Sequence, residues 1–225
     1  MKVDPQAFLA SLGAKADVMT SDQRADALEE FMMKQLAKPV APGSTTNVRR
    51  GTGVMFGGLT PSGHQPALAP LAKMPEKPGL ADFFRLRFMP HSVQHLLQSA
   101  NDALRKGQPE DIVFACLVHD IAINMIKVDH GWWAAQMLEP YVSEKVSWAI
   151  RHHQALRFYA DPAMGYEYPQ QYVRIFGEGY VPEPYIKATY EFAPGHKWYR
   201  EARMIPVHDL YAFDPNITVT LDPFI

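Results

Sequence analysis

The feature that most constrains this chain is an apolar stretch from Ile112 to Ile123 that carries one imidazole and one carboxylate, His119 and Asp120. A run this long and this apolar favours a helix that is buried on most of its faces. The two polar side chains then need partners, because an unsatisfied imidazole or carboxylate is costly in an apolar interior. Consecutive helical positions lie about 100° apart, so both side chains can reach one cation across a cavity. Two interpretations remain: part of a metal site, or a core histidine bonded to its neighbouring carboxylate.

The composition excludes several classes of protein. The 225 residues suit one large domain or one domain with an extension, and 47% hydrophobic with 20% charged residues is typical of globular proteins. A net charge of -2 provides no basic field to attract nucleic acid or an anionic membrane. The single cysteine, Cys116, permits no internal disulfide, and the sequence shows neither a secretory signal nor a long apolar span. We therefore expect a cytoplasmic protein with no nucleic-acid or membrane partner.

The N-terminal third differs in character from the rest. Helices are expected near residues 5–13 and 21–37, and the second helix carries an apolar stripe that would pack on the main body. The segment 39–79 then contains seven prolines and seven glycines, which leave little room for regular structure. We treat residues 1–79 as an N-terminal extension whose Pro/Gly-rich part is a linker or a lid.

The main body, residues 80–225, carries helical patterns separated by turn residues, and it predicts an all-α bundle. Its last helical stretch, 185–209, is expected to be interrupted at Pro194-Gly195 and at Pro206. The tail, 217–221, alternates apolar and polar residues, which predicts a short strand or an arm.

Side chains able to bind a metal recur along this helical body. They are His95, His119, Asp120, His130, His152 and Asp209. Bundles build metal sites from such side chains on facing helices. Imidazole and carboxylate donors suit iron, manganese, zinc or magnesium, and they argue against copper(I) or an iron–sulfur cluster.

These residues resemble the signature of the HD-domain superfamily: a His, a His-Asp pair and a later Asp on a helical bundle around one or two metals. The resemblance covers about residues 80–215. More closely, His95-Leu-Leu-Gln-Ser-Ala and His152-His-Gln-Ala-Leu-Arg-Phe are similar to motifs of the mixed-valent diiron HD oxygenases. That group includes myo-inositol oxygenase and the phosphonate-cleaving HD oxygenase. The resemblance implies an HD-domain helical bundle with two metal ions, Fe(II)/Fe(III), or alternatively manganese, zinc or magnesium.

The resemblance also implies a role for each ligand. Asp120 bridges both metals. One metal is completed by His95, His119 and Asp209, and the other by His130 and His152.

Two histidines compete with these assignments. His91 could replace His95, but only His95 heads the His-x-x-Gln-x-Ala pattern. His153 could replace His152, but His152 stands five residues before Arg157, as the family pattern expects.

The chain also departs from the family. Leu156 stands where related oxygenases carry a Lys, and Arg85 and Phe88 stand near the place where one of them has a Tyr and a Glu. Substrate identity therefore does not transfer.

A carboxylate-bridged metal pair supports two chemistries. With zinc, manganese or magnesium, it would hydrolyse a phosphoester. With iron, it would activate dioxygen for C-H abstraction and oxidative C-C or C-P cleavage of a small oxygen-chelating substrate. Aromatic flanks, Trp132 and Trp148 among them, favour the oxygenase, because a radical intermediate must be kept from water. Asp120, Lys127 and Arg157 are the expected catalytic residues, the last two as partners for an anionic substrate.

Overall fold

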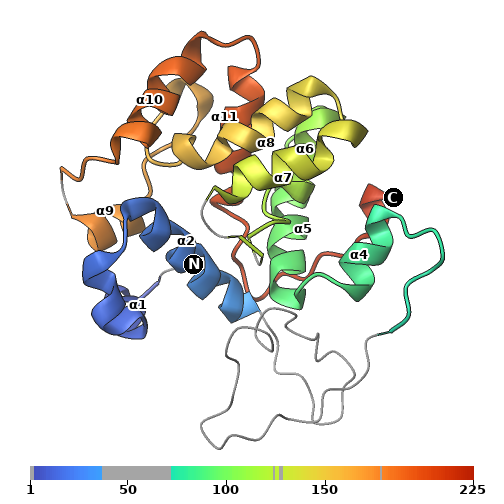
Figure 1. Cartoon of the computed structure of the whole chain (residues 1–225), viewed down its shortest axis with the longest axis horizontal. Helices are drawn as coiled ribbons and strands as arrows, with labels where there is room; N and C mark the ends of the chain where they lie inside the picture. Colours follow the sequence, from blue (N-terminus) through green and yellow to red (C-terminus); the bar gives the residue numbers. More distant parts are fainter. Residues whose placement is uncertain (1–2, 37–71, 124, 127–128, 178) are drawn as a thin grey trace, which may run out of the picture.

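The computed structural model describes residues 3–36, 72–123, 125–126, 129–177 and 179–225, and within these ranges it contains α-helices and short 3-10 helices but no strand (Figure 1). The predicted all-α bundle is confirmed. The Pro/Gly-rich lid or linker falls mostly on residues 37–71, outside the described residues. No helix in the described ranges combines the length and the apolar character needed to cross a membrane.

Five helices form the main body: α5 (Pro90–Arg105), α6 (Glu110–Val118), α7 (His130–Leu138), α8 (Glu144–Leu156) and α11 (Tyr199–Asp209). Helix α8 packs against both α7 and α11, and α5 packs against α6. Buried aliphatic side chains from all five helices form one continuous core. Ser143 begins α8 as its N-cap, accepting a hydrogen bond from the backbone N-H of Val146 at 3.4 Å. A short helix, α4 (Leu80–Leu86), leads into this body.

A second apolar cluster joins the N-terminal helices to the body. It unites α1 (Pro5–Leu12) and α2 (Ser21–Leu36) with α9 (Gln170–Phe176) and α10 (Pro184–Phe192). The stripe of α2 is buried through Leu28, Met32 and Leu36, and the cluster includes Phe158 and Phe213 of the body. Helix α2 also lies against α5. The prediction that this stripe packs on the main body is therefore confirmed.

The apolar run predicted that the His119-Asp120 pair lies within a helix, and this prediction is wrong. Helix α6 ends at Val118, and His119 and Asp120 occupy the turn that follows. The chain tightens there into three-residue turns, in which the N-H of Ile121 bonds to the carbonyl of Val118 at 3.3 Å. Neither glycine nor proline marks this helix end in the sequence, so the pattern gave no signal for it.

The expected break at Pro194-Gly195 is confirmed by the 3-10 turn Ala193–Gly195 between α10 and α11. The expected break at Pro206 and the strand alternative for the tail are wrong. Helix α11 continues through Pro206 instead of breaking there. Its flanking residues Arg203, Ile205 and His208 are all fully buried, so tertiary packing offsets the hydrogen bond that proline removes. Residues 217–221 form no strand; the amide of Gln94 bonds to both the N-H and the carbonyl of Val219, at 3.1 and 3.0 Å, in place of a strand partner.

Candidate metal centre

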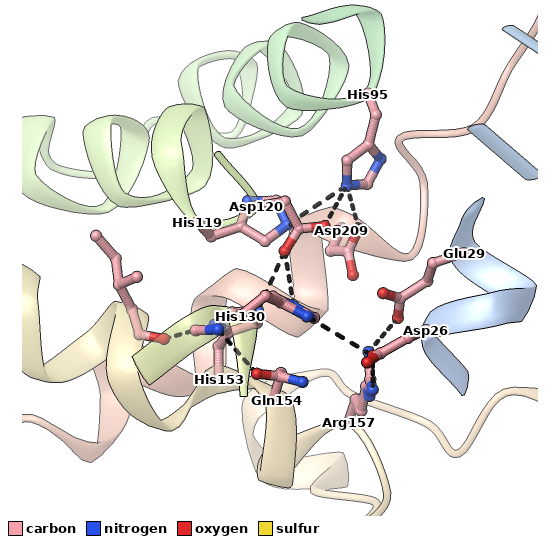
Figure 2. Close-up of polar contacts among 12 residues, drawn as sticks. Asp26, Glu29, His95, His119, Asp120, His130, His153, Gln154, Arg157 and Asp209 are labelled. Carbon is pink, nitrogen blue, oxygen red and sulfur yellow. Dashed lines mark hydrogen bonds and ion pairs between the residues drawn. The ribbon is translucent and has the colours of Figure 1, made fainter. Parts of the chain in front are cut away.

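The first group of candidate ligands meets around His95 of α5, which is fully buried. Its Nε2 atom lies 3.1 Å from Asp209 Oδ1, at the end of α11, and 3.5 Å from Asp120 Oδ2. The Nε2 atom of His119 lies 3.6 Å from the same Asp120 oxygen and 3.9 Å from Asp209 Oδ1. We call these four side chains the first set (Figure 2).

The second group meets at the other oxygen of Asp120. Its Oδ1 atom lies 3.0 Å from His130 Nε2 and 3.5 Å from His153 Nε2. Asp120, His130 and His153 are all buried, and we call them the second set. Asp120 therefore directs one carboxylate oxygen to each set, as a carboxylate that bridges two cations does (Figure 2).

Hydrogen bonds on the far side of each ring orient the imidazoles. The Nδ1 atom lies 3.2 Å from the Ala212 carbonyl for His95, 2.9 Å from the Cys116 carbonyl for His119 and 2.6 Å from the Ile150 carbonyl for His153. A carbonyl oxygen can only accept, so Nδ1 carries a proton in each of these rings, and Nε2 is the nitrogen that faces the centre. This arrangement is typical of histidines that bind metals.

The structure corrects one predicted ligand. His153 belongs to the second set, whereas His152 lies outside it and packs on Trp148, with 4.4 Å between ring centroids. Consecutive positions on α8 point about 100° apart, so only one of the two histidines can face the centre. The correction also moves Arg157 to four residues after the ligand, one helical turn away on the same side of α8.

Replacing each of the two neighbouring histidines by alanine gives a direct test of the His153 assignment. His153→Ala is expected to reduce the metal content of the loaded protein from two ions to one per chain, because the second set loses a ligand. His152→Ala is the matched control and should retain two. Metal analysis after anaerobic loading and desalting measures both variants. Equal loss in both, or loss only in His152→Ala, would refute the His153 assignment.

The other predicted residues have different surroundings. His91 is buried on α5 but belongs to none of the metal-capable groups found among the described residues. Lys127 lies outside the described residues. Arg157 is buried next to the second set, but its guanidinium is bonded to three carboxylates, so it offers no free anion site in this arrangement.

Those three carboxylates are the residues that the sequence analysis missed. Asp22, Asp26 and Glu29 of α2 are all buried, and Asp26 and Glu29 form a third metal-capable group with His130. Their spacing of four and then three residues places them on one face of the helix. An acidic stripe beside an apolar stripe was the available signal for them.

Gly131 allows α7 to approach the second set closely. A Cβ atom at this position would lie 2.8 Å from the Ile150 carbonyl oxygen and 2.9 Å from Cε1 of His153. Gly131→Ala is therefore expected to cost about 1–3 kcal/mol of unfolding free energy and to weaken metal binding by the second set. Gly195→Ala, where a Cβ atom would meet nothing within 4 Å, is the control for urea unfolding and metal titration. Unchanged values for Gly131→Ala would show that α7 and α8 are not packed this closely.

Opposite charges shift the pKa values of the ligands. Burial lowers the pKa of His95, but Asp209 and Asp120 outweigh it and raise that pKa to about 10. Burial also lowers the pKa of His130, but the carboxylates of Asp120 and Asp26 outweigh this effect and raise that pKa to about 9. For His119 burial prevails and lowers the pKa to about 4. Without a metal, protons on two imidazoles supply the positive charge that the carboxylates demand.

Unpaired acceptors and excess negative charge both fit a pair of divalent cations. Asp120 Oδ1 and Asp209 Oδ1 are buried, and an imidazole nitrogen, the kind of group that a metal would replace as their partner, lies 3.0 and 3.1 Å from them. Five carboxylates face one guanidinium here: Asp22, Asp26, Glu29, Asp120 and Asp209 against Arg157. With all five carboxylates ionised and the imidazoles neutral, four negative charges would remain, which two divalent cations would balance.

A pocket of about 310 Å³ lies beside the second set. It is lined by residues next to the ligands in sequence, Asp129 before His130 and Gln154 after His153, together with aromatic side chains of α7 and α10. The side-chain oxygen of Gln154, Oε1, accepts a hydrogen bond from the Gly131 N-H at 2.8 Å. The buried Nε2 atom of the same side chain has no hydrogen-bond partner among the described residues. This pocket has the size and the polar groups to hold a small molecule.

Comparison with known proteins adds no family to this description. No family model matches the chain, and no curated protein matches it either.

Proposed function

We propose that this protein is a two-metal HD-domain enzyme, and that it is an iron oxygenase cleaving a C-C or C-P bond of a small oxygen-chelating substrate. One observation carries the proposal: Asp120 directs its two oxygens to two separate groups of imidazoles. The donor set, four imidazoles and two carboxylates, suits iron. When bound, an iron pair would supply activation of dioxygen for abstraction of hydrogen from a substrate C-H bond.

The residues around the two sets would keep water away from the reacting atoms. His95, His119, Asp120 and His130 are at most 1% exposed. Phe213 stacks on His95 with 4.5 Å between ring centroids. A closed, partly aromatic site of this kind protects a reactive intermediate from solvent.

The state of Arg157 favours the oxygenase over a phosphohydrolase. A phosphoester carries negative charge and needs cations beside the metals. Arg157 is occupied by three carboxylates, so its guanidinium is not available to a phosphoester. Arg151 at the pocket remains as a cation that an anionic substrate could meet, so hydrolysis with manganese is the second candidate.

Oxygen consumption distinguishes the two candidates. Protein loaded anaerobically with Fe(II) is mixed with panels of vicinal polyols and hydroxylated phosphonates, and dioxygen uptake is recorded. The proposal predicts uptake by the wild type and by His152→Ala, and none by His153→Ala. Phosphate release from a phosphoester panel with Mn(II) under nitrogen, without oxygen uptake in the first panel, would instead establish the hydrolase.

The raised histidine pKa values predict proton release on metal binding. At pH 7, His95 and His130, with pKa values of about 10 and about 9, hold protons that two cations must displace. Metal affinity should therefore rise with pH and level off above about pH 9 to 10, and about two protons per chain should be released near pH 7. Calorimetric titration in two buffers of different ionisation enthalpy measures this number. No proton release would contradict the close pairing of these imidazoles with Asp120 and Asp209.

A further inference from the structure

Helix α2 contributes an acidic cluster to the interior of the protein. Asp22 and Asp26 each place Oδ1 within hydrogen-bond distance of Arg157 Nη2, at 2.7 and 2.5 Å, and Glu29 Oε1 lies 2.7 Å from Nη1. All four side chains are at most 5% exposed. Tyr172 adds a hydrogen bond to Glu29 at 3.2 Å. The guanidinium of Arg157 is thus held by a helix about 130 residues away in sequence.

One of these carboxylates also faces the second set. Asp26 Oδ1 lies 3.7 Å from His130 Nδ1, and Asp120 Oδ1 lies 3.0 Å from His130 Nε2. Figure 2 shows the imidazole of His130 between Asp120 on one side and Asp26 with Arg157 on the other. Asp22 contacts the same guanidinium nitrogen, but its carboxylate makes no ion pair with His130.

We infer that α2 completes the candidate metal centre: Asp26 is a positioning residue that keeps the Nε2 atom of His130 directed at the second metal, and Arg157 holds Asp26 in place. The inference rests on the proposed function, because it assigns these residues to the same site. Its physical basis is electrostatic: at 3.7 Å the Asp26 carboxylate is too far from Nδ1 for a hydrogen bond, but the ion pair favours the ring orientation in which Nε2 faces the second metal, as carboxylates beside metal-bound histidines do. Arg157 is suited to holding it, since a planar guanidinium binds several carboxylates in fixed directions.

The same contacts explain why three carboxylates surround one guanidinium. If Arg157 bonded to Asp26 alone, its remaining N-H groups would be buried without acceptors. Asp22 and Glu29 satisfy two of those directions, so the guanidinium cannot swing away from Asp26. The negative charge left over also attracts divalent cations to the second set.

The test compares two isosteric variants of the cluster, Asp26→Asn and Asp22→Asn. Each variant removes one of the carboxylates that surround Arg157, but only Asp26→Asn changes the group that faces His130. Co(II) is titrated anaerobically, and its visible absorption and its stoichiometry give the affinity of each set. We expect Asp26→Asn to weaken the second-set site about 10- to 100-fold and to leave the first set unchanged, with less than about a threefold effect for Asp22→Asn. His153→Ala supplies the reference spectrum for loss of the second set.

Each outcome decides the question. Equal loss in both variants would mean that the cluster acts only through its charge, which would overturn the positioning role. Unchanged affinity in Asp26→Asn would remove α2 from the metal centre. If Asp26→Asn does not fold, Asp26→Glu provides the measurement: restored second-set binding is expected, and its loss with intact first-set binding and fold would refute the inference. Wild type that binds fewer than two Co(II) ions would instead refute the proposed two-metal function itself.

Discussion

Asp120→Asn is expected to reduce the metal content from two ions per chain to at most one, and to lower turnover by at least about 100-fold. The asparagine side chain keeps the shape of aspartate but offers only one oxygen, so it cannot serve both sets. The wild-type carboxylate serves both, with Oδ2 3.5 Å from His95 Nε2 and Oδ1 3.0 Å from His130 Nε2. Metal analysis of anaerobically loaded protein, together with oxygen-uptake rates, measures both effects.

Two other aspartates provide controls for this substitution. Asp209→Asn should weaken only the first set, because Asp209 Oδ1 contacts His95 and His119 but no member of the second set among the described residues. Asp161→Asn should keep both metals, because Asp161 accepts a hydrogen bond from Tyr199, away from both sets. Two tightly bound ions in Asp120→Asn would show that this carboxylate does not bridge.

Arg157→Met is expected to cause the largest loss of stability of any single substitution at the site. It leaves Asp22, Asp26 and Glu29 buried without their counter-ion, which typically costs about 3–5 kcal/mol of unfolding free energy. For a domain of this size the corresponding drop in Tm is about 6–20 °C. The loss should be smaller at pH 5 than at pH 8. Burial raises the pKa of Glu29 to about 8 and also raises that of Asp26, so these groups favour the folded state when protonated and oppose it as pH rises.

A surface pair provides the control for that measurement. Lys34 forms an ion pair with Glu30 at 2.9 Å, with more than half of the lysine side chain exposed, so Lys34→Ala should change the Tm little. Thermal unfolding of metal-free protein at pH 5 and pH 8 gives both comparisons. A Tm for Arg157→Met within 2 °C of the wild type, on the scale of about 2–4 °C per kcal/mol, would show that the cluster is not buried as described.

The helical periodicity of α8 predicts which of its two neighbouring histidines faces the interior. The buried positions Val146, Ala149 and Ile150 continue, at helical spacing, to His153 and not to His152. The family pattern favours His152 because of its distance from Arg157, whereas the periodicity favours His153. The helix, the ligand type and the approximate position could all be predicted, whereas the choice between neighbours depended on the direction of the buried face.

The role of α2 could not be predicted in the same way. Its extent was expected correctly, because Ser21 and the Leu28-Met32 stripe define the helix locally. Which part of the body the acidic face meets is a long-range contact between α2 and α8, and no local pattern encodes it. Because the Pro/Gly-rich segment separates α2 from the main body in sequence, residues 1–79 were expected to be an extension. Helix α2 nevertheless contributes carboxylates to the centre of the molecule.

The tail shows how a local pattern can mislead. Residues 217–221 alternate as a strand does, but no neighbouring strand in the described chain pairs with them. Gln94 and Gln98 of α5 supply the missing partners through their side-chain amides, with Gln98 bonding to the carbonyls of Asp214 and Ile217 at 2.8 and 2.9 Å. Alternation predicts an extended backbone, but it does not predict what satisfies that backbone.

A bridged pair of iron ions would be detected by metal analysis of anaerobically purified protein combined with electron paramagnetic resonance after partial oxidation. We expect two irons per chain and a signal from a coupled Fe(II)/Fe(III) pair, which disappears in Asp120→Asn. Zinc, manganese or a single ion per chain, with no coupled signal after loading with Fe(II), would contradict it.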